Sequence, residues 1–132
     1  NCPYGITKVY ITAVGGGGAV GNNYIGNEGK FPGGAGGNGY SCFKTPVDVV
    51  HGAVYNIHVG ASGGGLVPGV GSIDAEDTTF SSLLTAAHGE NGGSASNGSA
   101  GKDGAGGWNI LQYGVGGRQG TVATGGLLII EW

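Results

Sequence analysis

Apolar and β-branched residues are gathered in a few short runs, and long glycine-rich stretches separate these runs. The pattern predicts strands over residues 6–14, 40–45 and 53–59. Residues 78–87 fit a bent strand or a short helix, and their Thr-rich start favours the strand. Residues 126–132 are strongly apolar, which predicts a strand that is buried on both faces or central in a sheet.

The alternation within these runs also predicts which side chains face inward. In the first run, Val9, Ile11 and Ala13 share one face and are expected in the core. The first and last strands flank everything else, so we expect them to be neighbours in one sheet. The polar stretches 22–31, 66–77 and 108–113 are expected to be exposed loops.

Glycine recurs at every third position between the strands, which is neither the period of an α-helix nor that of a strand. It is the period of an extended polyproline-II-like helix, which has no internal hydrogen bonds and can pair its backbone with neighbouring helices. Gly60 and Gly63 share this spacing. The glycines expected to pack in this way are Gly15, Gly18, Gly21, Gly33, Gly36, Gly39, Gly98, Gly101, Gly104, Gly107, Gly114, Gly117 and Gly120.

Two other structures have glycine-rich sequences. Collagen requires an unbroken Gly-X-Y repeat and abundant proline, whereas this chain has 4 prolines and broken registers. A flexible linker would suit any one tract, but several tracts in phase, alternating with strands, favour order. We therefore expect an all-β fold, with a small β-sandwich framework, a packed layer of polyglycine-II helices and exposed connecting loops.

Composition supports one domain over residues 1–132. Glycine accounts for 34 of 132 residues, and its large loss of backbone entropy on folding must be offset by dense hydrogen bonding and an apolar core. The chain opens Asn1-Cys2-Pro3 without methionine, which suggests a fragment of a longer chain. Cys2 and Cys42 either pair in a disulfide or remain buried free thiols.

Charge is sparse, with 5 basic and 8 acidic residues. The absence of a basic patch argues against nucleic acid as a partner, and no apolar run is long enough to insert in a membrane. The glycine tracts lack the Gly-Lys-Ser/Thr of a phosphate loop.

Catalytic and metal-binding motifs are not apparent, so we expect no enzyme activity, no cofactor and no metal. Three histidines have no ligand-like spacing, although a metal at a subunit axis stays open: His51, His58 and His88. Asp74, Glu76 and Asp77 fit a solvated loop better than a Ca²⁺ site or a catalytic carboxylate pair. Ser81 and Ser82 lack a nucleophile-elbow context.

The order of the motifs resembles a known family. The motifs are Val-Tyr-Ile-Thr-Ala-Val-Gly-Gly-Gly-Gly (9–18), Gly-Gly-Ala-Gly-Gly-Asn-Gly-Tyr (33–40), Tyr-Asn-Ile-His-Val-Gly-Ala-Ser-Gly-Gly (55–64), Asp-Thr-Thr-Phe-Ser-Ser-Leu (77–83), Gly-Val-Gly-Gly (114–117) and Gly-Gly-Leu-Leu-Ile-Ile-Glu-Trp (125–132). Across nearly the whole chain this order is similar to the glycine-rich C-terminal domain of bacteriophage tail-fibre and receptor-binding proteins. A looser similarity, to the glycine-rich extracellular domain of the anaplastic lymphoma kinase family, would imply more cysteines.

The resemblance to tail-fibre tips implies a virion protein that is assembled in the host cytoplasm and acts outside the cell. It implies an adhesin, often trimeric, that is joined to upstream fibre domains and binds a bacterial surface glycan or outer-membrane protein. An ice-binding or purely structural polyglycine-II protein is the alternative, although the irregular non-glycine positions argue against ice.

Aromatic residues in loops are the natural contacts for such a receptor. Two loops interrupt glycine tracts and therefore should emerge at the ends of the helix bundle. The expected receptor-binding residues are Tyr24, Lys30, Phe31, Trp108, Asn109 and Tyr113.

Overall fold

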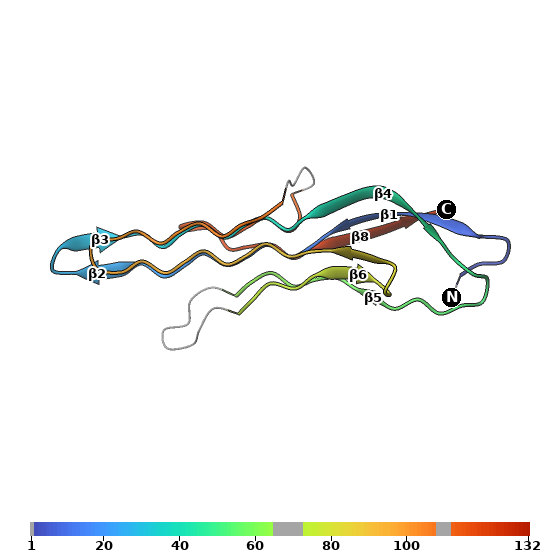
Figure 1. Ribbon diagram of the computed structural model, residues 1–132, viewed down its shortest axis with the longest axis horizontal. Coiled ribbons are helices and arrows are strands. Elements are labelled where there is room, and N and C mark those ends of the chain that lie inside the picture. The colour runs from blue at the N-terminus through green and yellow to red at the C-terminus, as the bar shows by residue number, and fades with distance from the viewer. Residues whose placement is uncertain (1, 65–72, 108–111) are drawn as a thin grey trace.

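The computed structural model describes residues 2–64, 73–107 and 112–132. In these residues every regular element is a strand, which confirms the expected all-β class. The strands are β1 (Lys8–Val14), β2 (Tyr24–Gly26), β3 (Gly29–Phe31), β4 (Ser41–Asp48), β5 (Ile57–His58), β6 (Thr78–Phe80), β7 (Leu84–Ala86) and β8 (Leu127–Glu131). The molecule is elongated, with the larger sheets at one end and the β2–β3 hairpin at the other (Figure 1).

Two three-stranded sheets form one end of the molecule. One has the order β4-β1-β8 and the other β5-β6-β7, and every recorded pairing is antiparallel. The first and last strands are neighbours as predicted, with Val14 opposite Leu127. Both sheets contribute to one hydrophobic cluster, in which Val9, Ile11 and Ala13 are buried as the alternation predicted.

The outer positions of the sheets differ from the sequence-based expectation. The apolar strand β8 lies at the edge of its sheet and is half-buried or exposed along its length, so its predicted central position is wrong. The central strand is β1, where Thr12 and Val14 are also buried, so that both faces are covered over its second half. Burial depends on which strand has partners at both edges, and hydrophobicity alone does not determine that.

Strand lengths also differ from expectation. β4 continues past residue 45 to Asp48, because Pro46 lies on an edge strand where its missing N–H costs little. β5 covers only Ile57–His58, and the ring of the preceding Tyr55 stacks on Phe80, with ring centroids 5.2 Å apart. Residues 78–87 form two strands joined by a turn rather than a helix.

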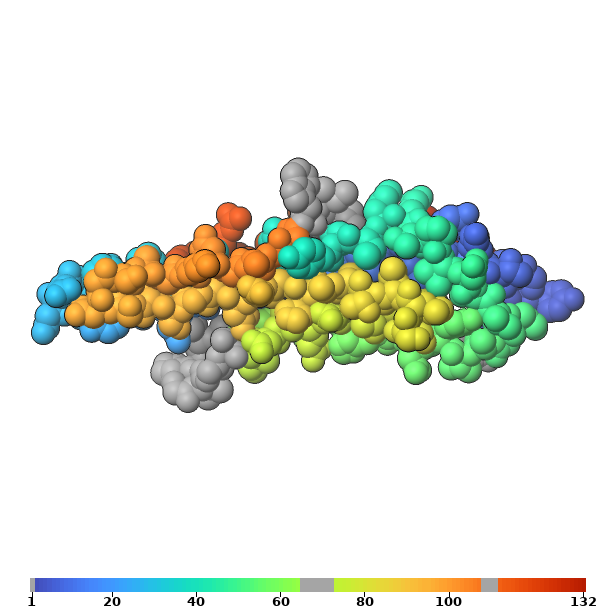
Figure 2. Space-filling view, in the orientation of Figure 1, coloured from blue at the N-terminus to red at the C-terminus, as the bar shows by residue number. Residues whose placement is uncertain are grey.

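Extended glycine-rich segments lie between the sheets and the distant hairpin or beside this path, and we call them the stem. The stem comprises residues 15–21, 33–40, 60–64, 73–77, 87–95, 101–107 and 114–126. Segment 15–21 is the innermost: all its residues except half-buried Val20 are buried, and its neighbours surround it. In the space-filling view the stem is narrow and continuous with the sheet end (Figure 2).

Backbone hydrogen bonds join the stem segments at intervals of three residues. The N–H groups of Gly15, Gly18 and Gly21 donate to the carbonyls of Tyr40, Gly37 and Gly34 at 3.1, 2.9 and 2.8 Å. The N–H groups of Gly101, Gly104 and Gly107 donate with the same spacing to Pro32, Ala35 and Asn38. Most of these bonds join different segments, although segment 114–126 also bonds within itself, for example from the Gly114 N–H to the Gly125 carbonyl. Stem stability is therefore largely a property of the assembled segments.

The stem glycines are required by close backbone packing. A Cβ at Gly18 would overlap the carbonyl oxygen of Glu90, and one at Gly36 would overlap that of Gly18. Two of the expected packing glycines are different: Gly98 and Gly120 have φ of +77° and +78° and no backbone atom within 4 Å of such a Cβ. These two lie in turns, where glycine is favoured because it tolerates positive φ.

Both cysteines are free thiols, Cys2 buried in the core cluster and Cys42 half-buried. In the described ranges there is no helix that is long and apolar enough to cross a membrane.

Candidate functional site

The β2–β3 hairpin forms the end of the stem farthest from the sheets (Figure 1). Sequence analysis predicted an exposed loop over 22–31, but Tyr24, Ile25 and Gly26 pair with Phe31, Lys30 and Gly29. The short strand pairing follows from the flanking stem segments, since 15–21 and 33–40 already run side by side and lead into the hairpin. The expected contact residues Tyr24, Lys30 and Phe31 are thereby brought together.

The two faces of the hairpin carry different chemistry. Directly opposed residues of an antiparallel pair share a face, so Tyr24 and Phe31 lie on one face and Ile25 and Lys30 on the other. Tyr24 and Phe31 are half-buried, and the Tyr24 ring lies against Gly26. Ile25 and Lys30 are exposed, and 77% of the surface of Ile25 is accessible.

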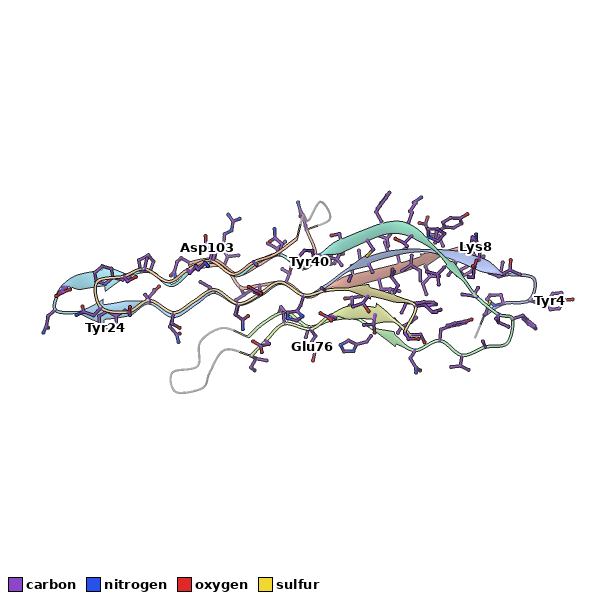
Figure 3. All side chains as sticks on the ribbon, in the orientation of Figure 1. Tyr4, Lys8, Tyr24, Tyr40, Glu76 and Asp103 are labelled. Atoms are coloured by element: carbon purple, nitrogen blue, oxygen red, sulfur yellow. The ribbon has the colours of Figure 1, made fainter. Side chains whose placement is uncertain are left out.

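Residues in neighbouring segments of the stem bond to the two residues that precede the hairpin. The N–H of Ala95 donates to the carbonyl of Asn22 at 2.8 Å, and residues Ser96 and Ser99 bond each other in a tight turn. Asn23 forms a reciprocal amide pair with Gln119, at 3.1 and 2.7 Å. These hydrogen bonds fix the hairpin to the neighbouring stem segments. Figure 3 shows Tyr24 at this end of the molecule.

The other expected contact residues are not at this tip. Tyr113 is about half exposed, but its neighbour Gly114 accepts a hydrogen bond from Gly39, next to the start of β4. Tyr113 is thus near the junction of stem and sheets, a full stem length from Tyr24. Trp108 and Asn109 lie outside the described residues.

Sequence analysis missed Ile25 as a candidate contact. Its side chain is exposed at the free end of the stem, beside the expected contact residues Tyr24 and Lys30, which makes it a further candidate to test. The signal was present in the Gly26–Gly29 spacing, which is compatible with a hairpin whose two connecting residues are Asn27 and Glu28.

The acidic residues 74, 76 and 77 are not gathered into one site. Each contacts a different partner: Asp74 accepts from Asn91 at 2.8 Å, Glu76 contacts His58 at 3.0 Å, and Asp77 accepts from His88. Within the described ranges, no group of three or more His, Cys, Asp or Glu side chains is arranged to hold a metal ion. The Glu76–His58 contact ties β5 to the stem, and the other two contacts join stem segments 73–77 and 87–95.

The Asp77–His88 contact is the shortest of the three. The His88 Nδ1–H and backbone N–H donate to the same carboxylate oxygen at 2.6 and 2.9 Å. The side-chain bond, followed by the backbone bond, lowers the pKa of Asp77 from its ordinary value of 3.8. The pair is therefore a structural clasp that prefers ionised Asp77.

Comparison with known proteins gives no relative from which to transfer a function. Neither the protein-family models, nor the curated proteins, nor the solved structures contain a match to this chain. The candidate site therefore rests on its own geometry.

Proposed function

We propose that this chain is the receptor-binding domain at the tip of a bacteriophage tail fibre, and that the β2–β3 hairpin contacts the bacterial surface. One observation supports this proposal above the others: Tyr24, Ile25, Lys30 and Phe31 gather at the free end of the stem. Cys2 and Trp132, the ends of the described chain, line one cavity at the sheet end. A partner approaching the hairpin along the stem axis therefore meets neither chain end.

The composition of the hairpin suits recognition. It combines two half-buried rings, one exposed aliphatic side chain and one cation on a supported base. Aromatic anchors dominate the energetics of protein interfaces, and amphipathic rings also suit polar, hydrated contacts. A bacterial glycan and an outer-membrane protein both remain within this proposal, as does assembly into a trimer with upstream fibre domains.

We further propose that the stem segments are polyglycine-II helices, and that the two three-stranded sheets form a small β-sandwich base. The three-residue spacing of the hydrogen bonds between segments supports this proposal. Scalar couplings across hydrogen bonds in NMR spectra test it directly. Coupling of the Gly18 amide to the Gly37 carbonyl is expected, and its absence would contradict the packed stem.

Binding of the purified chain to a panel of bacterial strains tests the proposed function. On a strain that the parent protein binds, the Tyr24→Ala variant is expected to bind with about thirtyfold lower affinity, the effect of losing a central aromatic anchor. Ile25→Ser is expected to weaken binding at an unchanged melting temperature, because the side chain is exposed. Val54→Ser is the matched control, since Val54 is 73% exposed but lies just before β5 at the sheet end.

Several outcomes would contradict the proposal. Unchanged binding of both hairpin variants would remove the hairpin from the contact surface, and an equal loss in Val54→Ser would indicate a non-specific effect. No binding to any strain, combined with thermal hysteresis in cold solution, would favour the ice-binding alternative.

A further inference from the structure

A groove of about 630 Å³ lies along the side of the stem. Its floor is segment 33–38, which bonds to segment 101–107 on one side and to residues 114–117 on the other. The floor presents glycine backbone, at Gly36 and Gly37, and the walls carry polar side chains. Volumes of this size hold small organic ligands in other proteins.

Two wall side chains are held in place by the stem while keeping polar atoms for a ligand. Asp103 Oδ1 accepts from the Ala35 N–H at 2.8 Å, and Asn38 Oδ1 accepts from the Gly116 N–H at 2.9 Å. Among the described residues, the second carboxylate oxygen of Asp103 and the side-chain NH₂ of Asn38 form no hydrogen bond. An anchored acceptor and an anchored donor therefore face one groove.

Gln119 is the third polar group and is also held. Its amide pairs in both directions with Asn23, at 3.1 and 2.7 Å, and it lines the groove beside Arg118. The pair connects the groove wall to the base of the hairpin. Anchored side chains lose little rotamer entropy when they bind, which favours recognition.

Arg118 supplies the cation of the groove and is the chain's single arginine. Its backbone is fixed by two hydrogen bonds to Thr121, at 3.0 and 2.8 Å, in a turn that contains Gly120. Within the described part of the chain, its guanidinium forms no ion pair, whereas Lys8 and Lys44 pair with Asp48 and Glu131. A planar guanidinium with free donors suits a carboxylate or a phosphate.

We propose that this groove binds an anionic saccharide, with sugar hydroxyls on Asp103 and Asn38 and the acidic group on Arg118. Hydroxyls both donate and accept, which matches an anchored carboxylate beside an anchored amide. A peptide is a poorer match, because alternate side chains of an extended peptide need pockets and the groove floor is mostly glycine. The inference deepens the proposed function, on which it rests, by adding a saccharide site beside the tip.

Binding of the whole chain to an array of bacterial surface saccharides tests this assignment. Retention of members that contain uronic acid or sugar phosphate, over their neutral counterparts, is the expected result. Uronic-acid and phosphorylated members on the same array separate carboxylate from phosphate as the recognised anion. A blank array, or equal binding of acidic and neutral saccharides, would overturn the inference.

Titration of the best acidic saccharide into the protein then tests the residues. Arg118→Gln is expected to lower the affinity for this saccharide at least about tenfold, since it removes charged hydrogen bonds. Arg118→Lys is expected to have an intermediate affinity, because lysine keeps the charge but lacks the paired N–H donors of the guanidinium. Lys102→Gln is the matched control: it removes the same charge from an exposed neighbour of Asp103 outside the groove lining. Equal losses of affinity in Lys102→Gln and Arg118→Gln would show that the effect comes from the overall charge of the protein and not from a specific contact with Arg118.

Amide chemical shifts locate the ligand during the same titration. Changes at Gly36, Gly37 and Asp103 are expected. Changes confined to Val20 and Thr121, which line a separate hollow that also includes Arg118, would contradict the assignment. Cell binding that depends on Tyr24 while the array stays blank would reject the groove and leave the tip proposal standing. The reverse pattern would reject the tip and leave the groove.

Discussion

At the residue scale, this protein depends on backbone-to-backbone contact that only glycine permits. Gly18 shows the dependence most directly, because its N–H bonds to Gly37, its carbonyl accepts from Gly117, and a Cβ would overlap the carbonyl of Glu90. The absence of a side chain at Gly18 therefore allows the close backbone packing that stabilises the stem. Its entropic cost on folding is offset by hydrogen bonds that a larger residue would separate.

Gly18→Ala is expected to destabilise the protein by about 2 kcal/mol or more, because at least two backbone hydrogen bonds must lengthen. Thermal or urea unfolding measures the loss. Gly125→Ala is the control, since a Cβ there would lie 3.4 Å from the Gly60 carbonyl oxygen and 4.0 Å from the Ser62 amide nitrogen, which are ordinary contact distances. Equal stability of the two variants would rule out a tightly packed stem.

The Asp77–His88 clasp predicts a dependence of stability on pH. The pKa of Asp77 is lowered in the folded state, so its contribution is complete above its ordinary pKa of 3.8. The contribution is lost as the pH falls through the lowered folded value. The stability difference between the parent and Asp77→Asn is therefore expected to shrink below pH 3.8, as urea titrations at a series of pH values can measure. A constant difference would exclude this linkage.

At the element scale, the β2–β3 hairpin is the part whose shape depends least on its own sequence. It has three residues in each strand, and such a hairpin is marginal in isolation. The flanking segments 15–21 and 33–40 hold its ends together. In the proposed receptor-binding role, such a hairpin is held in place by the stem and not by its own strand pairing.

Gly26→Ala tests the role of hairpin geometry in binding. The new Cβ would lie 2.5 Å from Cε1 of Tyr24 and 2.7 Å from its hydroxyl, so the ring must move. We expect several-fold weaker binding to host cells at a nearly unchanged melting temperature, because the ring tip moves easily. If NMR shows that the Tyr24 ring has moved and binding is nevertheless unchanged, the position of this ring is not important for binding.

At the scale of the whole molecule, the stem connects sheets and hairpin through its innermost segment. Segment 15–21 continues directly from β1, the central strand of its sheet, and leads to β2. Its hydrogen bonds reach segments on all sides, including 33–40, 60–64 and 87–95. Unfolding of this segment therefore requires the surrounding stem to open.

Amide hydrogen exchange is expected to reveal this arrangement. The amides of Gly15, Gly18 and Gly21 are buried and bonded, so they should exchange only through global unfolding. The amides of Ile25 and Lys30, at the exposed tip, should exchange through local opening at least tenfold faster. Exchange of Gly18 as fast as Ile25 would mean that the stem opens independently of the sheets.

The sequence by itself determined the local features of this protein. Alternation placed Val9, Ile11 and Ala13 in the core, because side-chain direction along a strand has a period of two. The glycine period of three anticipated the spacing of the hydrogen bonds between stem segments. Both are properties of neighbouring residues, and a chain can encode them without reference to its remote parts.

The tertiary structure alone decided which segments are partners. Glycine has no side chain to specify a neighbour, so the contact of Gly18 with Gly117 is set by the assembly of the whole stem. The edge position of β8 and the pairing of Tyr24 with Phe31 have the same origin. The separation of Tyr113 from Tyr24 likewise follows from the path of the stem, which places Gly114 beside Gly39 near the sheets and Tyr24 in the hairpin at the far end (Figure 1).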